Sequence, residues 1–383
     1  MLLFSFAVVA LSFWVVLTLF MLYGRSRMTY LKNVSVSGDF TEPRVVIIIA
    51  VRNEEEHLSQ ALQSVTQLQY SRYRIMVIND RSTDKTAEIL QGFEAAYPHL
   101  DVITINELPQ GWLGKNHALY TGYKNSSEEW MLFADADVAF EPSTLQKAMQ
   151  YCLQKNLDHL TVLPDVQSRS QILNSMMASF LILLEMRQRP WAARNPNSNA
   201  SLGVGAFNLV KRTAYEKAGT HTAIALRPDD DLQLGARIKQ SGGRPDAFYG
   251  RDQIGLEWYP SVKAFIAGLM KNTFSVFDYN LLKVIVTGVM PLLLLLVLPL
   301  PILLLFGGIT EWWMAVAILF SQMVLFAWPG GLRTKWWYAL MVPFAGALLI
   351  YILLKAAITT LMQGGIYWRE SFYPLSELKK GGQ

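Results

Sequence analysis

The chain contains four long stretches in which apolar residues follow one another without any charged side chain. They cover residues 1–24, 284–310, 312–332 and 336–354. At about 1.5 Å of rise per residue, an α-helix of about 20 residues crosses the roughly 30 Å hydrocarbon core of a bilayer. The pattern therefore predicts one membrane-spanning helix at the N-terminus and three toward the C-terminus.

The charges that flank these stretches predict their orientation. Arg25, Arg27 and Lys32 follow the first stretch, whereas a cleaved signal peptide has its positive residues before the apolar core. We expect an uncleaved anchor with its N-terminus outside the cell and the following segment in the cytoplasm. Arg333 and Lys335 mark the loop before the last stretch as cytoplasmic too.

The C-terminal tail does not agree with a count of four spans. Four spans leave the tail outside, yet it contains Arg369, Lys379 and Lys380. A last span that is interfacial or re-entrant is the alternative. The predicted domains are an anchor over 1–24, a cytoplasmic domain over 25–280, transmembrane helices over 281–361 and a tail over 362–383.

Between the membrane segments, apolar runs of strand length alternate with helical patterns. The runs cover residues 45–51, 74–78, 102–105 and 131–134, and the first is apolar throughout, which is typical of a strand buried on both faces. A helical spacing of apolar residues follows the first run, from Leu58 to Leu68. This alternation predicts an α/β fold with a parallel or mostly parallel sheet and with ligands at the carboxyl ends of its strands.

The composition narrows the functional classes. Hydrophobic residues make up 52% of the chain and charged residues only 17%, which agrees with a membrane protein. The formal net charge of +4 is too small to suggest a nucleic-acid partner. The single cysteine excludes an intramolecular disulfide framework and a cysteine-rich metal site. Neither a G-x-G-x-x-G fingerprint nor a Walker or G-x-S-x-G motif occurs in the sequence.

Two aspartates stand directly after the apolar run at 131–134. Asp135 and Asp137 are two residues apart, and a turn after the first brings both carboxylates to one cation. Carboxylate oxygens are the ligands that Mg²⁺ and Mn²⁺ prefer. The alternative is that both aspartates only close the strand through Asx turns.

Acidic residues follow the first two runs as well. Asp80 ends the second run, and Glu54 belongs to three consecutive glutamates in the turn after the first. Both have a plain structural reading, because acidic residues are favoured at a helix N-terminus. The residues after Asp80, which are Ser82, Thr83 and Asp84, suit a helix N-cap better than catalysis.

A glycine-flanked turn carries a lysine before a predicted helix. Gly111 and Gly114 enclose the turn, and Lys115 follows directly. One reading places the Lys115 ammonium against a phosphate group. The other is a helix entry with a solvated lysine.

A third acidic cluster, Asp229, Asp230 and Asp231, precedes a helical pattern. Adjacent carboxylates repel one another, which raises the pKa of at least one toward that of a useful base. A solvated acidic helix start is the alternative. Residues 171–189 form an apolar helical pattern with a basic end, which fits either a core helix or a helix lying on the bilayer.

The order of these motifs resembles one enzyme family. VIIIAVRNEEE, VINDRSTDKT, GWLGKNHA, FADADV and DDDLQLGARIKQSGGR resemble, in sequence order, the family-2 glycosyltransferases of the GT-A fold. The resemblance covers roughly residues 44–275. With the apolar flanks and the terminal GGIYWRESFYPL, the chain looks like the membrane-bound, lipid-glycosylating branch. That branch includes ceramide, hopanoid-associated and carotenoid (diaponeurosporenoate) glycosyltransferases, and the last look most similar.

The resemblance implies a binding site for a nucleotide-sugar donor. In that family the corresponding residues contact the base and ribose, the diphosphate, and a divalent metal that is Mg²⁺ or Mn²⁺. The base and ribose residues would be Val51, Asn53, Glu54 and Asp80. Lys115 would lie near the diphosphate, Asp135 would hold the nucleotide-sugar beside the metal, and Asp137 would bind the metal.

The resemblance also implies the catalytic residues. The family has an acidic pair before an L-x-x-R helix, which corresponds here to Asp230 and Asp231, with Asp231 as the general base. Processive and ceramide-type members carry a Q/R-x-x-R-W motif, and residues 268–272 read GLMKN instead. Lys271 would still neutralise the diphosphate, but the departure favours transfer of a single sugar over polymer synthesis.

The implied function is inverting transfer of one sugar, from a UDP-hexose, to a membrane lipid or carotenoid acceptor. Two alternatives remain open. One is transfer to a polyprenyl phosphate, as in enzymes of the dolichol-phosphate-mannose type, whose acceptor is already an anion. The other is a non-catalytic membrane scaffold with a degenerate transferase fold.

Overall fold

The computed structural model describes residues 1–36, 41–328, 330–368 and 371–380, and its chain divides into two compact units. We call Met28–Val166 with Gln188–Glu257 the sheet unit. Met1–Arg27, Gln167–Arg187 and Trp258–Gln383 form the helical unit. Arg369, which belongs to the tail and the terminal motif, lies outside the described residues.

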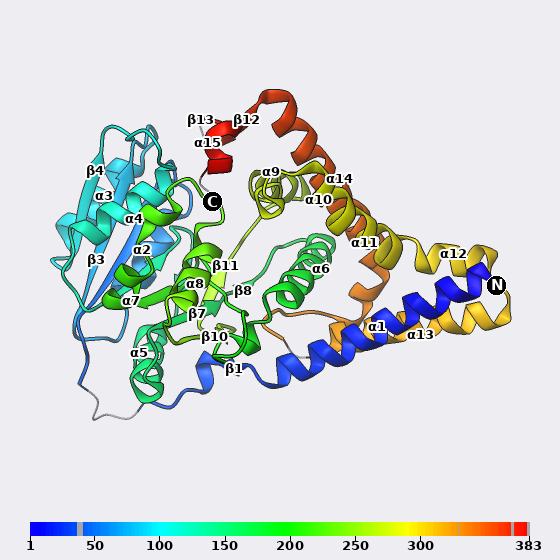
Figure 1. Ribbon diagram of the computed structural model, residues 1–383. Helices are drawn as coiled ribbons and strands as arrows, with labels where there is room; N and C mark the ends of the chain where they lie inside the picture. The colour runs from blue at the N-terminus through cyan, green and yellow to red at the C-terminus, as the bar shows by residue number, and fades with distance from the viewer. Residues whose placement is uncertain (37–40, 329, 369–370, 381–383) are drawn as a thin grey trace. The chain divides into compact units, whose positions relative to one another are not determined.

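The sheet unit is built on an eight-stranded sheet (Figure 1). Every neighbouring pair is parallel except those of β9, which runs antiparallel to both β5 and β7. The predicted α/β fold with a mostly parallel sheet is therefore confirmed. In spatial order the strands are β1 (Thr29–Tyr30), β10 (Pro245–Tyr249), β7 (His159–Leu163), β9 (Asn208–Lys211), β5 (Trp130–Ala134), β2 (Val45–Val51), β3 (Tyr73–Asp80) and β4 (Leu100–Ile105).

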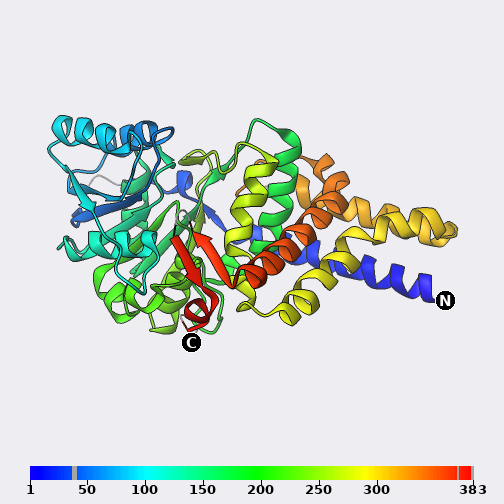
Figure 2. The same cartoon turned by 90° about the horizontal axis from the view of Figure 1, so that it is seen from above.

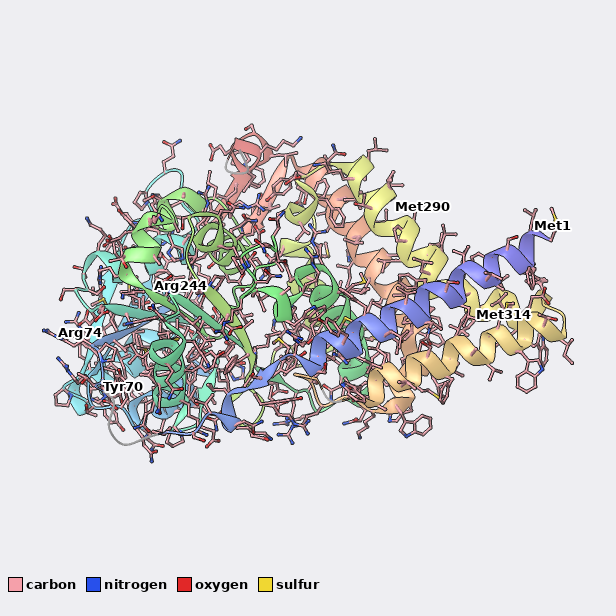
Figure 3. The ribbon with its side chains drawn as sticks, turned by 60° about the horizontal axis from the view of Figure 1, so that its bottom comes forward. Met1, Tyr70, Arg74, Arg244, Met290 and Met314 are labelled. Carbon is pink, nitrogen blue, oxygen red and sulfur yellow. The ribbon has the colours of Figure 1, made fainter. Side chains whose placement is uncertain are left out.

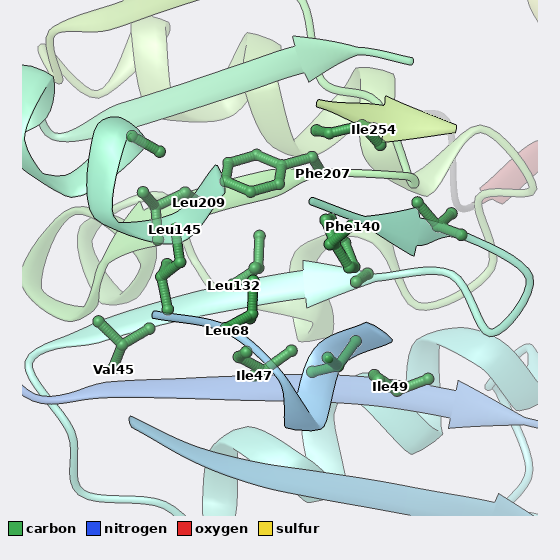
Figure 4. Close-up of a cluster of buried hydrophobic side chains, with 14 of the residues drawn as sticks. Val45, Ile47, Ile49, Leu68, Leu132, Phe140, Leu145, Phe207, Leu209 and Ile254 are labelled. Carbon is green, nitrogen blue, oxygen red and sulfur yellow. The ribbon is translucent and has the colours of Figure 1, made fainter. Parts of the chain in front are cut away.

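Strand β2 shows why this sequence forms a central strand. Successive side chains of a strand point to opposite faces, and both faces of β2 are buried in apolar clusters. Val45, Ile47 and Ile49 pack on one face with Leu132 of β5, as Figure 4 shows. Each such side chain stabilises the fold by roughly 1.5–3 kcal/mol through its burial.

Helices cover both faces of this sheet. Residues of α2, α3 and α5 belong to the apolar cluster on one face, and residues of α4, α7 and α8 to the cluster on the other. A second, three-stranded sheet has the order β6 (Ala139–Phe140), β11 (Ile254–Leu256) and β8 (Asp165–Val166). The helices are α2 (Leu58–Thr66), α3 (Thr86–Ala96), α4 (Gly114–Lys124), α5 (Thr144–Lys155), α7 (Arg212–Lys217) and α8 (Asp230–Gln240).

Among the described residues of the helical unit, three helices are long and apolar enough to cross a membrane. These are Leu2–Ser26, Ile309–Ala327 and Trp336–Gln363. Its elements are α1 (Leu2–Ser26), α6 (Gln171–Gln188), α9 (Val262–Asn272), α10 (Leu281–Lys283), α11 (Met290–Leu292), α12 (Pro299–Phe306), α13 (Ile309–Ala327), α14 (Val342–Gln363), β12 (Gly365–Trp368), β13 (Ser371–Pro374) and α15 (Leu375–Lys380).

The structure differs from the prediction over residues 284–310, which do not form one continuous α-helix. Val284–Val289 and Leu293–Val297 are π-helical, and α12 begins at Pro299. Proline removes a backbone N–H and so disturbs the helical hydrogen-bond ladder around it. A fourth span exists only if the helices at 262–277 and 281–297, which meet at 106°, are counted as one. Among the described residues, three continuous helices and one broken segment thus correspond to the four predicted spans.

Helices α1 and α13 lie side by side and run in the same direction (Figures 1 and 2). Thr18 of α1 donates to the carbonyl of Ser321 at 3.2 Å, and the Ser321 hydroxyl donates to the carbonyl of Trp14 at 3.0 Å. Met1 and Met314 lie toward the same end of the pair in Figure 3. Hydrogen bonds from small polar side chains are a usual means of joining helices in lipid.

A buried ion pair joins α1 to α6 within the helical unit. Arg25 donates to Glu185 from Nε at 3.1 Å and from Nη2 at 2.9 Å, and both side chains are buried. Its Nη1 donates to the carbonyl of Leu325 on α13 at 3.1 Å. Helix α6 therefore belongs with the apolar helices of the helical unit, and whether it also lies on a bilayer stays a prediction.

We expect Arg25→Met to lower the free energy of unfolding of the helical unit by about 3–5 kcal/mol, because a carboxylate then stays buried without the guanidinium. The double variant Arg25→Met/Glu185→Leu is expected to recover most of that loss. Thermal unfolding in detergent measures both. Lys32→Met is the control, since its pair with Asp252 is 40–45% exposed and contributes roughly 0–1 kcal/mol. Equal melting temperatures for Arg25→Met and Lys32→Met would contradict this account.

Candidate functional site

Two loops at the carboxyl ends of β2 and β3 hold each other through reciprocal hydrogen bonds. Asn53, in the left-handed region at φ 53°, donates its N–H to the Ser82 hydroxyl at 3.1 Å and accepts the N–H of Thr83 at 2.8 Å. The N–H of Glu54 donates to the Thr86 hydroxyl at 2.9 Å. The side chain of Asn53 therefore has a structural role, and a role in nucleotide binding remains a prediction.

Asp80 is buried at the end of β3 between two guanidinium groups. Arg81 donates to its two carboxylate oxygens at 2.7 and 3.1 Å, and Nη1 of Arg52 lies at 3.9 Å. A methyl group on Gly114 would lie 2.3 Å from an Asp80 oxygen, so the start of α4 lies against Asp80. Val51 is buried at the end of β2, one strand away.

Lys115 joins the carboxyl end of β5 to the start of α8. Its Nζ lies 2.8 Å from Asp135 and 3.8 Å from Asp230. Burial alone would lower the pKa of Lys115, but Asp135, Asp230 and Asp231 raise it above its ordinary value. Lys115 thus lies at the entry of α4 and is paired with two carboxylates, and its contact with a phosphate group stays a prediction.

These residues line one pocket in the sheet unit. It is bounded by charged side chains from β5, α4 and α8 and by polar and apolar side chains between them. The lining residues are Lys115, Leu119, Phe133, Ala134, Asp135, Gly205, Asn208, His221, Asp230, Asp231 and Leu234.

Three adjacent aspartates take separate roles. Asp229 is held by Arg227 through two hydrogen bonds of 2.9 Å and does not line the pocket. Burial raises the pKa of Asp230 to about 7, although Lys115 opposes the shift. Burial also raises the pKa of Asp231, whose carboxylate accepts the N–H groups of Leu232 at 2.7 Å and Gly205 at 2.9 Å. Asp230 and Asp231 are thus two carboxyl groups that bind a proton more readily than an exposed aspartate.

Asp137 lies in a negative environment on the other side of Asp135. Burial, and then the charges of Asp135 and Glu54, raise the pKa of Asp137 to about 7. No group of three or more His, Cys, Asp or Glu within the described ranges is arranged as a metal site. Two carboxylates still fit a hard divalent cation whose other ligands are oxygens of a bound molecule, because a cation would relieve this repulsion.

The structure thus brings Lys115, Asp135, Asp230 and Asp231 together. Asp135 and Glu54 both lie close enough to Asp137 to interact with it electrostatically, and Asp80 lies against the start of α4. Lys271 lies in α9 of the helical unit, so its proposed contact with a diphosphate remains a prediction.

Sequence reasoning missed the loop from Gly203 to Gly205, which separates Asp135 from Asp231. Gly205 accepts the N–H of Asp135 at 3.0 Å and donates its own to Asp231. A methyl group on Gly203 would lie 1.9 Å from the main-chain oxygen of Asp231. The spacing of the two glycines in residues 201–207 was the available signal, since glycine permits close approach of backbone.

Gly205→Ala is expected to disrupt the site while leaving the fold intact. The added methyl group would lie 2.5 Å from Oδ2 of Asp135, and that carboxylate can rotate away from it and from Lys115. We expect at least about a tenfold loss of affinity for the ligand that Asp135 holds, measured by calorimetry. Gly92→Ala, on α3 where nothing lies within 4 Å, is the control and should gain roughly 0.5–1 kcal/mol of stability. Unchanged affinity in Gly205→Ala would contradict the arrangement.

Two buried histidines predict a dependence of stability on pH. Burial lowers the pKa of His159 to about 4 and that of His221 to about 3. An unfolded histidine binds a proton near pH 6.5, so the stabilising contribution is present above that pH and is lost as the pH falls through 4.

We expect His159→Gln to be less stable than wild type at pH 7.5, and the difference to shrink by about 3 kcal/mol toward pH 4. Urea unfolding of both proteins across this pH range measures the difference in their free energies of unfolding. The contributions of the other titrating groups are common to both proteins and cancel in that difference. A difference that stays constant with pH would contradict the neutral state of His159.

The part of the chain that contains the pocket also matches known proteins. The profile of the family described as "Glycosyltransferase like family 2" matches residues 43–250. A 4,4'-diaponeurosporenoate glycosyltransferase of Staphylococcus aureus (strain USA300) is 26% identical over 200 residues, which cover 52% of this chain and 52% of that protein. The chain therefore spans about half the length of the curated relatives it matches.

A solved structure is similar over nearly the whole chain. Mannosyltransferase PcManGT from Pyrobaculum calidifontis, in complex with GDP-Man and Mn²⁺, matches with a TM-score of 0.55. The match covers 94% of this chain and 99% of that one at 18% identity. At this identity the similarity shows a common fold.

Proposed function

We propose a function from one premise, which is that this chain belongs to the glycosyltransferase like family 2 and has the GT-A fold. The protein transfers a single sugar from a nucleotide-sugar to a lipid acceptor at a membrane, with inversion at the anomeric carbon. A UDP-hexose is the expected donor, and a membrane lipid or carotenoid is the expected acceptor.

One observation carries the proposal: a lysine ammonium and several aspartate carboxyl groups line the same pocket. Lys115 lies 2.8 Å from Asp135 and 3.8 Å from Asp230, and all three line the pocket together with Asp231. A displacement that inverts configuration needs the leaving group and the base on opposite sides of the reacting carbon. A pocket that carries both a cation for the leaving diphosphate and carboxyl groups for the acceptor proton supports such a displacement.

The donor would lie along the carboxyl ends of β2, β3 and β5. Val51, Asn53, Glu54 and Asp80 surround the expected place of the base and ribose. Lys115 would neutralise the diphosphate, with Lys271 as a second candidate from α9. Asp135 and Asp137 would hold a divalent cation, which when bound offsets the charge that develops on the leaving diphosphate.

Asp231 would act as the general base. Its carboxylate would accept the proton of an acceptor hydroxyl as that oxygen bonds to the anomeric carbon and the bond to the diphosphate breaks. The raised pKa of Asp231 favours this role, because a base works best when its pKa lies near the working pH. Asp230 would be a second carboxyl group, beside Asp231, that can bind a proton.

The acceptor is inferred from the membrane helices and the named relative. Three apolar helices among the described residues fit a multi-pass membrane protein, and α1 and α13 run in parallel, with Arg25 in the last turn of α1 and Arg333 after the corresponding end of α13. Positive residues on the cytoplasmic side favour a cytoplasmic catalytic domain over 25–280, between an anchor at 1–24 and helices at 281–361, with the tail at 362–383. The relative's substrate name, a diaponeurosporenoate, supports a carotenoid or another lipid.

Nucleotide binding by the full chain in detergent tests the proposal. A melting-temperature panel would compare UDP, GDP and their sugars, each with and without Mn²⁺. GDP-sugars are included because the mannosyltransferase of similar fold was solved with GDP-Man. We expect one nucleotide-sugar to raise the melting temperature in a metal-dependent manner. A panel in which no nucleotide raises it would overturn the proposed donor site.

A further inference from the structure

A buried asparagine on β9 faces the pocket. Asn208 is 2% exposed and is among the residues that line it. Val210, two residues on and therefore on the same face of the strand, belongs to the apolar cluster with Phe133 and Leu234. An asparagine is unfavourable on such a strand face unless its amide is hydrogen-bonded, so Asn208 calls for a specific partner.

His159 of the neighbouring strand β7 holds this amide. Its Nε2 lies within hydrogen-bonding distance of Oδ1 of Asn208, and the ring is fully buried. Nδ1 of His159 has no hydrogen-bond partner in the described part of the chain. A proton on Nδ1 would bury an unsatisfied donor, so the ring carries its proton on Nε2 and donates to Oδ1 of Asn208.

This assignment leaves the Asn208 nitrogen directed elsewhere. A methyl group on Gly203 would lie 3.2 Å from Nδ2 of Asn208 and 1.9 Å from the main-chain oxygen of Asp231, so the nitrogen lies on the Asp231 side. Within the described residues, the Asn208 side chain forms a hydrogen bond only with His159. Two N–H donors are thus available beside the pocket.

The chemistry of the pocket selects what these donors bind. Asp231, on whose side the amide nitrogen lies, would repel an anionic group at that place. A hydroxyl group fits, because its oxygen accepts from the amide while its own proton is donated to a carboxylate. Hydroxyl groups are carried by a donor sugar and by an alcohol acceptor alike.

We propose that Asn208 binds a substrate hydroxyl group through its amide N–H, and that His159 is a positioning residue that fixes the orientation of the amide. This inference rests on the proposed function and adds to it a residue that discriminates between substrates. An analogue that lacks the hydroxyl group would leave the amide unpaired.

Four variants of the full chain test it with the nucleotide-sugar selected by the panel. Asn208→Leu removes the donor, His159→Phe removes the ring N–H, and His159→Gln replaces it with an amide N–H. Thr161→Val is the control, because its hydroxyl is buried on β7 and donates to the carbonyl of Phe207 outside the pocket lining. For each we would measure the donor Kd by calorimetry, kcat, KM for both substrates and Tm.

We expect Asn208→Leu and His159→Phe to weaken substrate binding by about tenfold, and His159→Gln to restore it to within about threefold of wild type. Thr161→Val should lower Tm without changing these constants. A raised donor Kd assigns the hydroxyl group to the sugar, and a raised acceptor KM alone assigns it to the acceptor. Each supports the proposal.

If Asn208→Leu folds and keeps the wild-type donor Kd, kcat and KM, the assignment of Asn208 is overturned, while the proposed function is not affected. If that variant does not fold, equal constants for His159→Phe and His159→Gln would overturn it instead. A wild type that binds no nucleotide-sugar would overturn the proposed function and this assignment with it.

Discussion

Asp231→Asn is expected to reduce transfer to a hydroxyl acceptor by roughly 10²–10⁴-fold, which is the usual contribution of a general base. An amide has no basic site for the acceptor proton, but it has nearly the shape of the carboxylate, and its oxygen can still accept one of the two N–H groups, of Gly205 and Leu232, that the two carboxylate oxygens accept. Donor affinity should therefore stay within a few-fold of wild type. Initial rates and calorimetry measure the two quantities separately.

Asp246→Asn is the matched control for this prediction. Asp246 is another aspartate whose pKa is raised by burial, but it lies on β10 and accepts a hydrogen bond from Tyr151 at 2.9 Å. It should keep its transfer rate. Full turnover of Asp231→Asn on a hydroxyl acceptor would contradict the assignment of the base. An acceptor that is already an anion, such as a polyprenyl phosphate, needs no base, so the loss should be absent with it.

Asp137→Asn is expected to abolish metal-dependent donor binding, with a loss of roughly 10²-fold in affinity when Mn²⁺ is present. Two carboxylates and a bound diphosphate fit the cation, and the variant removes one of the carboxylates. Calorimetry with and without Mn²⁺ measures this loss. Donor affinity that keeps its full dependence on Mn²⁺ would contradict the role of Asp137.

The stability of Asp137→Asn in the absence of metal provides a second test of the environment of Asp137. The pKa of Asp137 is raised from its ordinary value of 3.8 to about 7 in the folded chain, so ionisation destabilises wild type increasingly as the pH rises from about 4 to 7. Asp137→Asn lacks this penalty. Its stability relative to wild type should therefore increase over that range and level off above pH 7, and a difference that does not change with pH would contradict the environment of Asp137.

The central strands of the sheet unit could be predicted because each is encoded by the apolar pattern of a few consecutive residues. The apolar run at 45–51 became β2, and its burial on both faces follows from the absence of alternation. Since parallel strands end at one edge, ligands were expected at the carboxyl ends of the strands, and there Arg52 does lie 3.9 Å from Asp80 and Glu54 acts on Asp137.

The parts that were missed depend on contacts between distant residues. Strand β9 is four residues long, from Asn208 to Lys211. So short a segment shows no periodicity from which an antiparallel strand within a parallel sheet could be predicted. Gly205, in the loop before β9, lies between Asp135 and Asp231, and Asn208 of β9 lines the same pocket. The pairing of Asp229 with Arg227 likewise removes one of three adjacent aspartates from the site, which no spacing rule could indicate.

Transfer of a labelled sugar into lipid tests the central claim most directly. Full-length protein in vesicles that contain a lipid or carotenoid acceptor would be given the nucleotide-sugar selected by the panel, carrying a radiolabelled hexose. We predict label in an organic-extractable product, carrying one sugar per acceptor, with Asp231→Asn as the background. Donor binding without any label in the organic phase would contradict the account.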